Sequence, residues 1–306
     1  MLENIYVDSN VFPFGGYERI WEKARIVILG VPYDSTSSYR PGSRFGPNVI
    51  RLAAANVESY SLRAGLDVDE IDGIYDWGDL VVTHDVKTTL KRVTDAVADI
   101  ISVKKFPLIL GGEHTITYGV INGLEEHVSN AFTLVVFDAH LDLRNEYPPG
   151  DPLTHATVLR RIHESFRSKI DKIIILGMRA VSKEEINYLQ QNKGELLAIT
   201  SLDIMQEKEE PLSVLDTLRG KDMYLSIDVD VVDPAFAPGV SNPEIEGIDP
   251  SHLLDLLKLV FEKCRRIIGA DIVEYNPVYD KSGVTAVLVA KLIYEIVAMT
   301  HVWRKI

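Results

Sequence analysis

The sequence predicts an α/β protein in which a mainly parallel sheet of roughly eight strands is covered by helices on both faces. Short apolar runs rich in Val, Ile and Leu recur from end to end of the 306-residue chain, and helical patterns lie between them. Near-continuous apolar runs are typical of strands that are buried on both faces. The alternation of strands with helices favours parallel pairing, because a helix returns the chain to the starting edge of the sheet.

Eight segments have the composition of buried strands. In chain order they are 25–33, 73–79, 106–112, 132–140, 172–178, 196–200, 222–230 and 266–276. No long linker, low-complexity run or internal repeat separates them. We therefore expect one domain over residues 1–306, since α/β folds of this length are often a single domain.

Helical patterns with recognisable first residues lie between these strands. They cover residues 86–105, 182–192 and 250–264. Asp85 and Asp249 stand where a side chain can accept a hydrogen bond from the first turn of a helix. Ser182 and Glu185 have the spacing of a capping box. These signals predict where the three helices begin.

Composition and charge exclude several classes of protein. The net charge of −13 argues against binding to nucleic acids or anionic membranes, both of which need a basic surface. It is compatible with a cationic substrate, although solubility explains it equally well. The single cysteine, Cys264, allows no intramolecular disulfide, and the first residues do not resemble a signal peptide. These features favour the cytoplasm.

The longest apolar segment is GVTAVLVAKLIYEIVAMTHVW, near the C-terminus. Lys291 and Glu295 interrupt it, so we interpret it as a buried helix rather than a membrane span. Three connections are unusually long, at 34–46, 143–155 and 231–248. Long loops in a compact domain are usually functional, so we expect a site near them.

Metal-ligand side chains follow three of the predicted strands. They are His114, then Asp138, His140 and Asp142, then Asp228 and Asp230. A spacing of two predicts that the members of one set lie on the same face of an extended segment. Open α/β sheets bind ligands outside the carboxyl ends of their strands, so the three sets are expected to meet there.

The residue types in this set indicate a pair of metal ions. Four converging carboxylates repel one another unless a cation neutralises them, and two imidazoles point to a metal. Two nitrogens and many oxygens are too many donors for one tetrahedral zinc ion. An oxygen-rich site with some imidazole favours Mn²⁺ over Mg²⁺ or Co²⁺, and such a pair activates water for hydrolysis. His155, at the end of a loop rich in Gly and Pro, could be a general acid or proton shuttle.

Three motifs resemble, in order and spacing, the signature regions of the ureohydrolase family, which includes arginase and agmatinase. They are GGEHT (111–115), FDAHLDLR (137–144) and SIDVDVVDPAFAPG (226–239). Further matches lie at 30–51, 76–79, 153–160 and 271–277, so the resemblance covers nearly the whole chain. It implies an arginase-like, three-layer α/β/α fold, an assembly of three or six copies, and a centre of two Mn²⁺ ions per subunit.

The resemblance also implies a role for each site residue. The first ion would take His114, Asp138, Asp142 and Asp228, and the second would take His140, Asp138, Asp228 and Asp230, with Asp138 and Asp228 bridging. Asp142 would also orient the attacking water, and His155 would shuttle a proton. Glu274 would pair with the substrate guanidinium, in keeping with the strength of carboxylate–guanidinium pairs.

The loop after the second motif lacks the Asn- and Ser/Thr-rich pattern with which arginase-like members bind an amino-acid head group. RPGSRFGP and DAHLDLRNEY are more similar to agmatinases, so the resemblance implies hydrolysis of agmatine to putrescine and urea. Glu146 or Asp151 could form an acidic mouth that binds the free amine of agmatine, or could be solvated loop charges.

Other reactions stay open at this point. The nearest is cleavage of N1-aminopropylagmatine to spermidine. Hydrolysis of guanidinobutyrate or formiminoglutamate would need a cation for the substrate carboxylate, which Arg144 could supply, and arginase activity is a further alternative. A scaffold protein that had lost catalysis would be expected to lack some ligands, yet all are present. The chain departs from the family pattern at Glu113, where Asp is more usual, and at Ser241-Asn242, where Gly or Thr is more usual.

Overall fold

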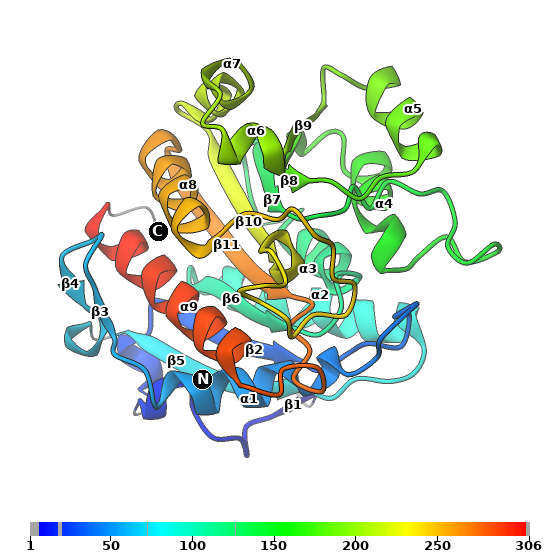
Figure 1. Ribbon diagram of the computed structural model, residues 1–306. Helices are drawn as coiled ribbons and strands as arrows, with labels where there is room; N and C mark the ends of the chain where they lie inside the picture. The colour runs from blue at the N-terminus through cyan, green and yellow to red at the C-terminus, as the bar shows by residue number, and fades with distance from the viewer. Residues whose placement is uncertain (1–5, 18–19, 72, 126, 304–306) are drawn as a thin grey trace.

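A single large sheet forms the middle layer of the molecule (Figure 1). The computed structural model describes residues 6–17, 20–71, 73–125 and 127–303. Within these residues the sheet has nine strands, in the order β1-β5-β2-β6-β11-β10-β7-β8-β9. Their bounds are Val7–Asp8 (β1), Ile26–Val31 (β2), Ile74–Leu80 (β5), Phe106–Gly111 (β6), Phe132–Phe137 (β7), Ile170–Met178 (β8), Leu196–Thr200 (β9), Asp222–Asp228 (β10) and Arg266–Val273 (β11).

The predicted parallel sheet is confirmed. Each of the eight segments expected to be strands overlaps one strand, and these strands pair in parallel. The ninth strand, β1, was not predicted from the sequence. It has two residues and pairs antiparallel with β5 at the edge of the sheet. Its two residues are too few to show a periodic pattern in the sequence. A separate two-stranded ribbon joins Tyr60–Ser61 (β3) to Leu66–Asp67 (β4).

Helices cover both faces of the sheet, which confirms the three-layer α/β/α architecture. One face carries Gly46–Ala54 (α1), Ser201–Met205 (α6), Pro250–Lys263 (α8) and Val284–Val302 (α9). The other carries Val86–Ser102 (α2), Ile116–Glu125 (α3), Val158–Ser165 (α4) and Lys183–Gln191 (α5), and the short α7 spans Glu209–Leu212. Alternate residues of β7 contribute to opposite layers, since Val135 lies in the first core and Val136 in the second.

The predicted helix starts agree with the structure. The Asp85 carboxylate accepts a hydrogen bond from the backbone of Thr88 at 2.7 Å, and Ser182 and Glu185 form the expected capping box. The sequence shows no comparable capping residue before helix α3, so this helix was not predicted. Its glycines weaken the helical pattern, but Gly119 is required because a Cβ there would lie 2.8 Å from the Leu90 carbonyl oxygen of α2.

The apolar C-terminal segment is helix α9. It is long and apolar enough to cross a membrane, yet 72% of its most apolar window is buried within the fold. Figure 1 shows it beside α8 on one face of the sheet. The Glu295 carboxylate accepts a hydrogen bond from the Ser61 hydroxyl at 2.6 Å, and Lys291 donates to the carbonyl oxygen of Glu58 at 3.1 Å. The two charges that interrupt the segment are therefore satisfied within the protein, as expected of a core helix.

Candidate metal centre

The carboxyl ends of β6, β7 and β10 bring the six predicted ligands into one cluster. His114 follows β6, three ligands follow β7, and Asp228 ends β10. The turns differ from the extended segments that the spacing predicted. Strand β7 ends at Phe137, and Asp142 has a left-handed backbone with φ of 49°. Asp230 lies in a 3₁₀ helix, Val229–Val231.

Two overlapping groups of donor atoms are present. His114 Nδ1 lies 3.2 Å from an oxygen of Asp138, 3.0 Å from one of Asp142 and 3.6 Å from one of Asp228. His140 Nδ1 lies 3.1 Å from an oxygen of Asp230 and 3.5 Å from the second oxygen of Asp138. In each of two triads, which share Asp138, the potential ligand atoms lie within 4.8 Å of one another. The arrangement offers two adjacent positions for divalent ions.

Backbone hydrogen bonds orient the carboxylates. Asp138 Oδ1 accepts from the amide of His140 at 2.6 Å, and Asp228 Oδ1 accepts from the amide of Asp230 at 2.9 Å. Asp230 Oδ1 accepts from the amide of Ala139 at 3.1 Å. Each carboxylate thus uses one oxygen to fix a turn, and its Oδ2 faces a histidine of the cluster.

A buried chain of two hydrogen bonds orients the ring of His114. Its Nε2 lies 3.1 Å from the hydroxyl oxygen of Ser226, and that hydroxyl donates to Asp271 at 2.6 Å. Because the Ser226 hydroxyl donates its proton to Asp271, its oxygen accepts a hydrogen bond from the Nε2–H group of His114. This tautomer leaves a lone pair on Nδ1, the atom that faces the carboxylates. Such outer hydrogen bonds are typical of metal-binding histidines.

The electrostatics of the cluster also fit a pair of cations. Burial, reinforced by Asp230 and Asp138, raises the pKa of Asp228 well above its usual range. Burial and the Asp138 charge raise the pKa of Asp142 to about 7. His114 Nδ1 and Asp138 Oδ2 are buried without a hydrogen bond within the described chain. Divalent ions would neutralise the crowded carboxylates and take up these two unpaired atoms.

His155 lies at the start of a 3₁₀ helix, His155–Thr157, beside the loop 34–46. Its Nε2 is 3.1 Å from the Ser38 hydroxyl, and its backbone amide donates to Thr36 Oγ1 at 3.2 Å. Burial lowers the pKa of His155 to about 4, so the ring is neutral near pH 7. Glu113, the departure from the family pattern, accepts a hydrogen bond from the Thr36 amide at 2.9 Å and so holds this loop.

Glu274 follows β11 and has a left-handed backbone, with φ of 64°. Its amide donates to the Gly112 carbonyl oxygen at 2.7 Å, which fixes it beside the chain that leads to His114. Burial and the Glu113 charge raise the pKa of Glu274 to about 8. A bound cation, such as a guanidinium, would stabilise the charged form of this carboxylate, which burial disfavours.

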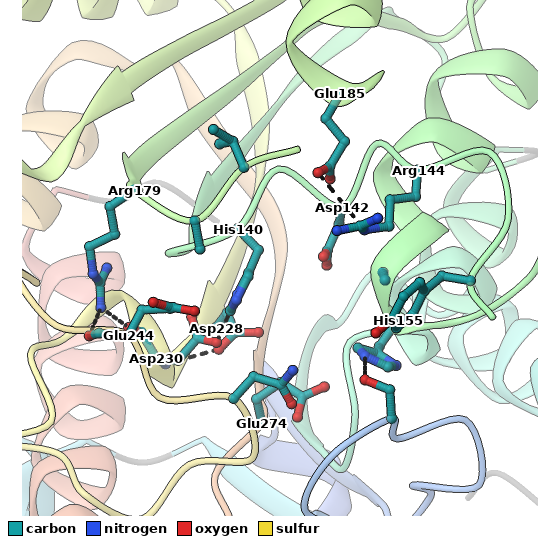
Figure 2. A pocket seen from close by; sticks show the side chains of 16 residues that line it. His140, Asp142, Arg144, His155, Arg179, Glu185, Asp228, Asp230, Glu244 and Glu274 are labelled. Atoms are coloured by element: carbon teal, nitrogen blue, oxygen red, sulfur yellow. Dashed lines mark hydrogen bonds and ion pairs between the residues drawn. The ribbon is translucent and has the colours of Figure 1, made fainter. Parts of the chain in front are cut away.

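These residues share one cavity of about 460 Å³, a normal size for a small-molecule site. Four predicted ligands line it together with His155 and Glu274 (Figure 2). Several other lining residues were given no role by the chemical pattern, among them Ser38, Arg179, Glu185, Asn242 and Glu244. Arg179 directly follows β8, so the strand-end rule that found the ligands would also have found it. The long loops 34–46, 143–155 and 231–248 each contribute to the wall, as expected.

The two carboxylates suggested for an acidic mouth lie elsewhere. Glu146 is exposed and accepts a hydrogen bond from the amide of Gly150 at 3.0 Å. Asp151 lines a neighbouring hollow that shares Ser38 and Tyr147 with the site. Neither residue lines the cavity of the metal cluster, so the structure does not bring Asp151 together with the other site residues. A substrate contact of Asp151 stays a prediction.

Comparison with known proteins agrees with this geometry. The model of the arginase family matches residues 24–299. The chain belongs to the arginase family. An agmatinase of Bacillus cereus is 34% identical over 276 residues, covering 90% of this chain and 91% of the relative. An N(1)-aminopropylagmatine ureohydrolase of Thermococcus kodakarensis is 37% identical and covers 92% and 93%. The crystal structure of the agmatine ureohydrolase of Thermoplasma volcanium has a TM-score of 0.81 and 34% identity, covering 94% and 93%.

Membership of the family confirms the resemblance seen in the three motifs. Family members depend on a binuclear metal centre, and among the residues that the structure describes the two triads that share Asp138 could hold one. The family match spans all six predicted ligands, His155 and Glu274.

Proposed function

We propose that the protein is a manganese-dependent ureohydrolase that converts agmatine to putrescine and urea. The observation that carries the proposal is the meeting of a cluster of two histidines and four aspartates with Glu274 at one cavity. Relatives that bear the names agmatinase and agmatine ureohydrolase support the choice of substrate. We propose that residues 1–306 act as one domain, and that three or six copies assemble in the cytoplasm.

Six side chains would hold the metal. The first position would use His114, Asp138, Asp142 and Asp228, and the second His140, Asp138, Asp228 and Asp230. Two divalent ions held there would lower the pKa of bound water and so supply a hydroxide nucleophile near neutral pH. The excess of carboxylate oxygens over imidazole nitrogens favours manganese over zinc.

The chain's own groups would position the substrate and move protons. Glu274 would pair with two N–H groups of the guanidinium and so hold the reacting carbon at the cluster. Asp142 would orient the attacking water. When the C–N bond breaks, the leaving nitrogen needs a proton, which the water supplies. His155 is neutral near pH 7, because burial lowers its pKa to about 4, and could carry this proton.

A second candidate is hydrolysis of N1-aminopropylagmatine to spermidine and urea. The relative from Thermococcus kodakarensis that carries this name favours it. Both compounds present a guanidinium at one end and an amine beyond it, so the same site chemistry would serve both. Guanidino acids and arginine differ because they carry a carboxylate.

Urea release by Mn²⁺-reconstituted protein tests the proposal. Agmatine, N1-aminopropylagmatine, 4-guanidinobutyrate and arginine are assayed side by side, with the Glu274→Gln variant as a matched control. We expect release from agmatine and none from arginine. A tenfold preference for aminopropylagmatine would move the assignment to the second candidate. No release from any of the four, with two manganese ions bound per chain, would contradict the proposed function.

A further inference from the structure

Glu244 lies in the loop 231–248 and lines the cavity beside the metal cluster (Figure 2). Its backbone carbonyl oxygen accepts a hydrogen bond from Arg179 Nη2 at 2.9 Å. The same nitrogen donates to the carbonyl oxygen of Asp230 at 2.6 Å. One side-chain nitrogen therefore ties the backbone of Glu244 to that of a proposed metal ligand.

The remaining donors of Arg179 are also occupied. Nε donates to the carbonyl oxygen of Ile245 at 2.9 Å. Nη1 donates to the carbonyl oxygens of Gly177 at 3.3 Å and Val231 at 3.2 Å. A guanidinium has five N–H groups, and here all five meet backbone carbonyls. Arg179 is thus a clamp for the loop, and it has no donor left for a substrate carboxylate or for the side chain of Glu244.

The carboxylate of Glu244 differs from the other two glutamates of the cavity. Glu185 accepts hydrogen bonds from the amides of Leu143 at 3.2 Å and Ser182 at 2.9 Å, and Glu274 accepts one from a backbone amide. Across the parts of the chain that the structure describes, no hydrogen bond or ion pair engages the Glu244 carboxylate. It is the glutamate of this cavity whose oxygens remain open to a ligand.

The second arginine of the cavity, Arg144, is held less tightly than Arg179. Arg144 Nε lies 3.9 Å from an oxygen of Glu185, and its guanidinium stacks over the ring of Tyr147 at 4.8 Å. The 3.9 Å separation is too long for a hydrogen bond, so Arg144 is held by charge attraction and ring stacking alone. Glu244 is the carboxylate of this wall that has no partner among the described residues, and a substrate whose far end is positively charged would supply one.

We propose that Glu244 binds the ammonium group at the far end of the substrate and so selects amine-ended guanidines over guanidino acids. This assignment rests on the proposed ureohydrolase function. A carboxylate–ammonium hydrogen bond is charge-assisted and therefore among the stronger polar contacts. Because Arg179 fixes Glu244 relative to Asp230, the distance between the two subsites is set by the fold. Chains of matching length can then engage both subsites at once.

The test compares agmatine with n-butylguanidine, which has the same four-carbon chain but no ammonium group. The quantity measured is the ratio of kcat/KM for agmatine to kcat/KM for n-butylguanidine, in wild type and Glu244→Gln. Loss of one charged hydrogen bond predicts that this ratio falls by about 10- to 100-fold. Glu246→Gln, on the same loop but exposed and outside the cavity wall, is the matched control and keeps the wild-type ratio.

Each other outcome has a distinct meaning. If Glu244→Gln lowers kcat/KM equally for both compounds, its role is structural and the assignment is wrong. If the wild type does not prefer agmatine, the ammonium subsite does not exist although the hydrolase function stands. If the wild type releases urea from neither compound, the proposed function fails and the subsite with it. Manganese content and melting temperature of each variant confirm that the site is intact.

Discussion

The carboxylate of Glu274 accepts a hydrogen bond from the backbone amide of His114, with 2.8 Å between Oε1 and the nitrogen. The two residues are 160 positions apart in the chain and lie at the ends of neighbouring strands, β11 and β6. The contact joins the proposed guanidinium partner to a proposed metal ligand. This hydrogen bond holds the carboxylate in place and uses one of its roughly four lone pairs, so both oxygens can still accept from the guanidinium of the substrate.

Glu274→Gln is expected to separate substrate binding from metal binding. Glutamine keeps an oxygen that can accept from the His114 amide, but it lacks the charge that pairs with a guanidinium. A charged hydrogen bond contributes about 1.5–3 kcal/mol, so kcat/KM for agmatine should fall by roughly 10- to 100-fold or more. Urea release measures this loss, and elemental analysis of the dialysed protein should still find about two manganese ions per chain. Loss of manganese from the variant would contradict the assigned role.

His155→Asn is expected to lower kcat by about 10²- to 10⁴-fold, the usual contribution of a proton-transferring side chain. KM should change little, because the ring does not pair with the guanidinium in the proposed arrangement. The Ser38→Ala variant is the comparison, since it removes the hydroxyl 3.1 Å from the ring and leaves the imidazole in place. Steady-state kinetics should show a smaller loss for Ser38→Ala. An equal loss in both variants would indicate that ring position, rather than proton transfer, limits the rate.

Metal-free protein is expected to become more stable as the pH falls from 8 toward 5. Burial raises the pKa of Glu274 to about 8 and those of Asp142 and Glu113 to about 7. In this window these groups bind protons in the folded state and not in the unfolded state. Each such proton changes the free energy of unfolding by about 1.4 kcal/mol per pH unit. His155 opposes the trend below its ordinary pKa, because burial lowers its pKa to about 4.

Thermal unfolding of chelator-treated and Mn²⁺-loaded protein across this range measures the effect. Bound metal keeps Asp142 ionised, so the rise in melting temperature conferred by Mn²⁺ should be larger at pH 8 than at pH 5.5. A metal-free melting temperature that falls as the pH is lowered from 8 to 5.5 would show that the carboxylates are not crowded as described.

Arg51→Ala is expected to destabilise the fold while leaving the residues that line the cavity unchanged. The fully buried guanidinium of Arg51 forms two hydrogen bonds with Asp76, at 2.7 and 3.0 Å, and a third with Asp79 at 2.6 Å. Removing it leaves the buried carboxylate of Asp76 without its cation, which costs about 3–5 kcal/mol. Urea denaturation measures the loss. Arg63→Ala, which breaks a surface pair with Asp255, should cost less than about 1 kcal/mol. Similar values for both variants would refute the role of the buried pair.

The sequence by itself determined the layers and the chemical nature of the centre. Strands buried on both faces need near-continuous apolar residues, so their positions are visible without a structure. Ligands at the end of a strand, or a few residues beyond it, are brought to the sheet edge by the strand itself, which is why His114, Asp138 and Asp228 could be located from local pattern. Helix α3 was missed because Gly119, needed for close packing on α2, weakens the helical signal.

Only the tertiary structure decided which charges form the rest of the cavity wall. Glu274 was found by resemblance to a family, since no local pattern marks a carboxylate whose partner is the amide of His114 on another strand. Glu146 and Asp151 have the charge that an amine subsite needs, but the cavity wall contains Glu244 instead. Arg179 holds Glu244 at the cavity, because its guanidinium donates to the carbonyl oxygens of both Asp230 and Glu244. Contacts of this kind depend on how loops fold back across the sheet, and residue spacing along the chain carries no record of them.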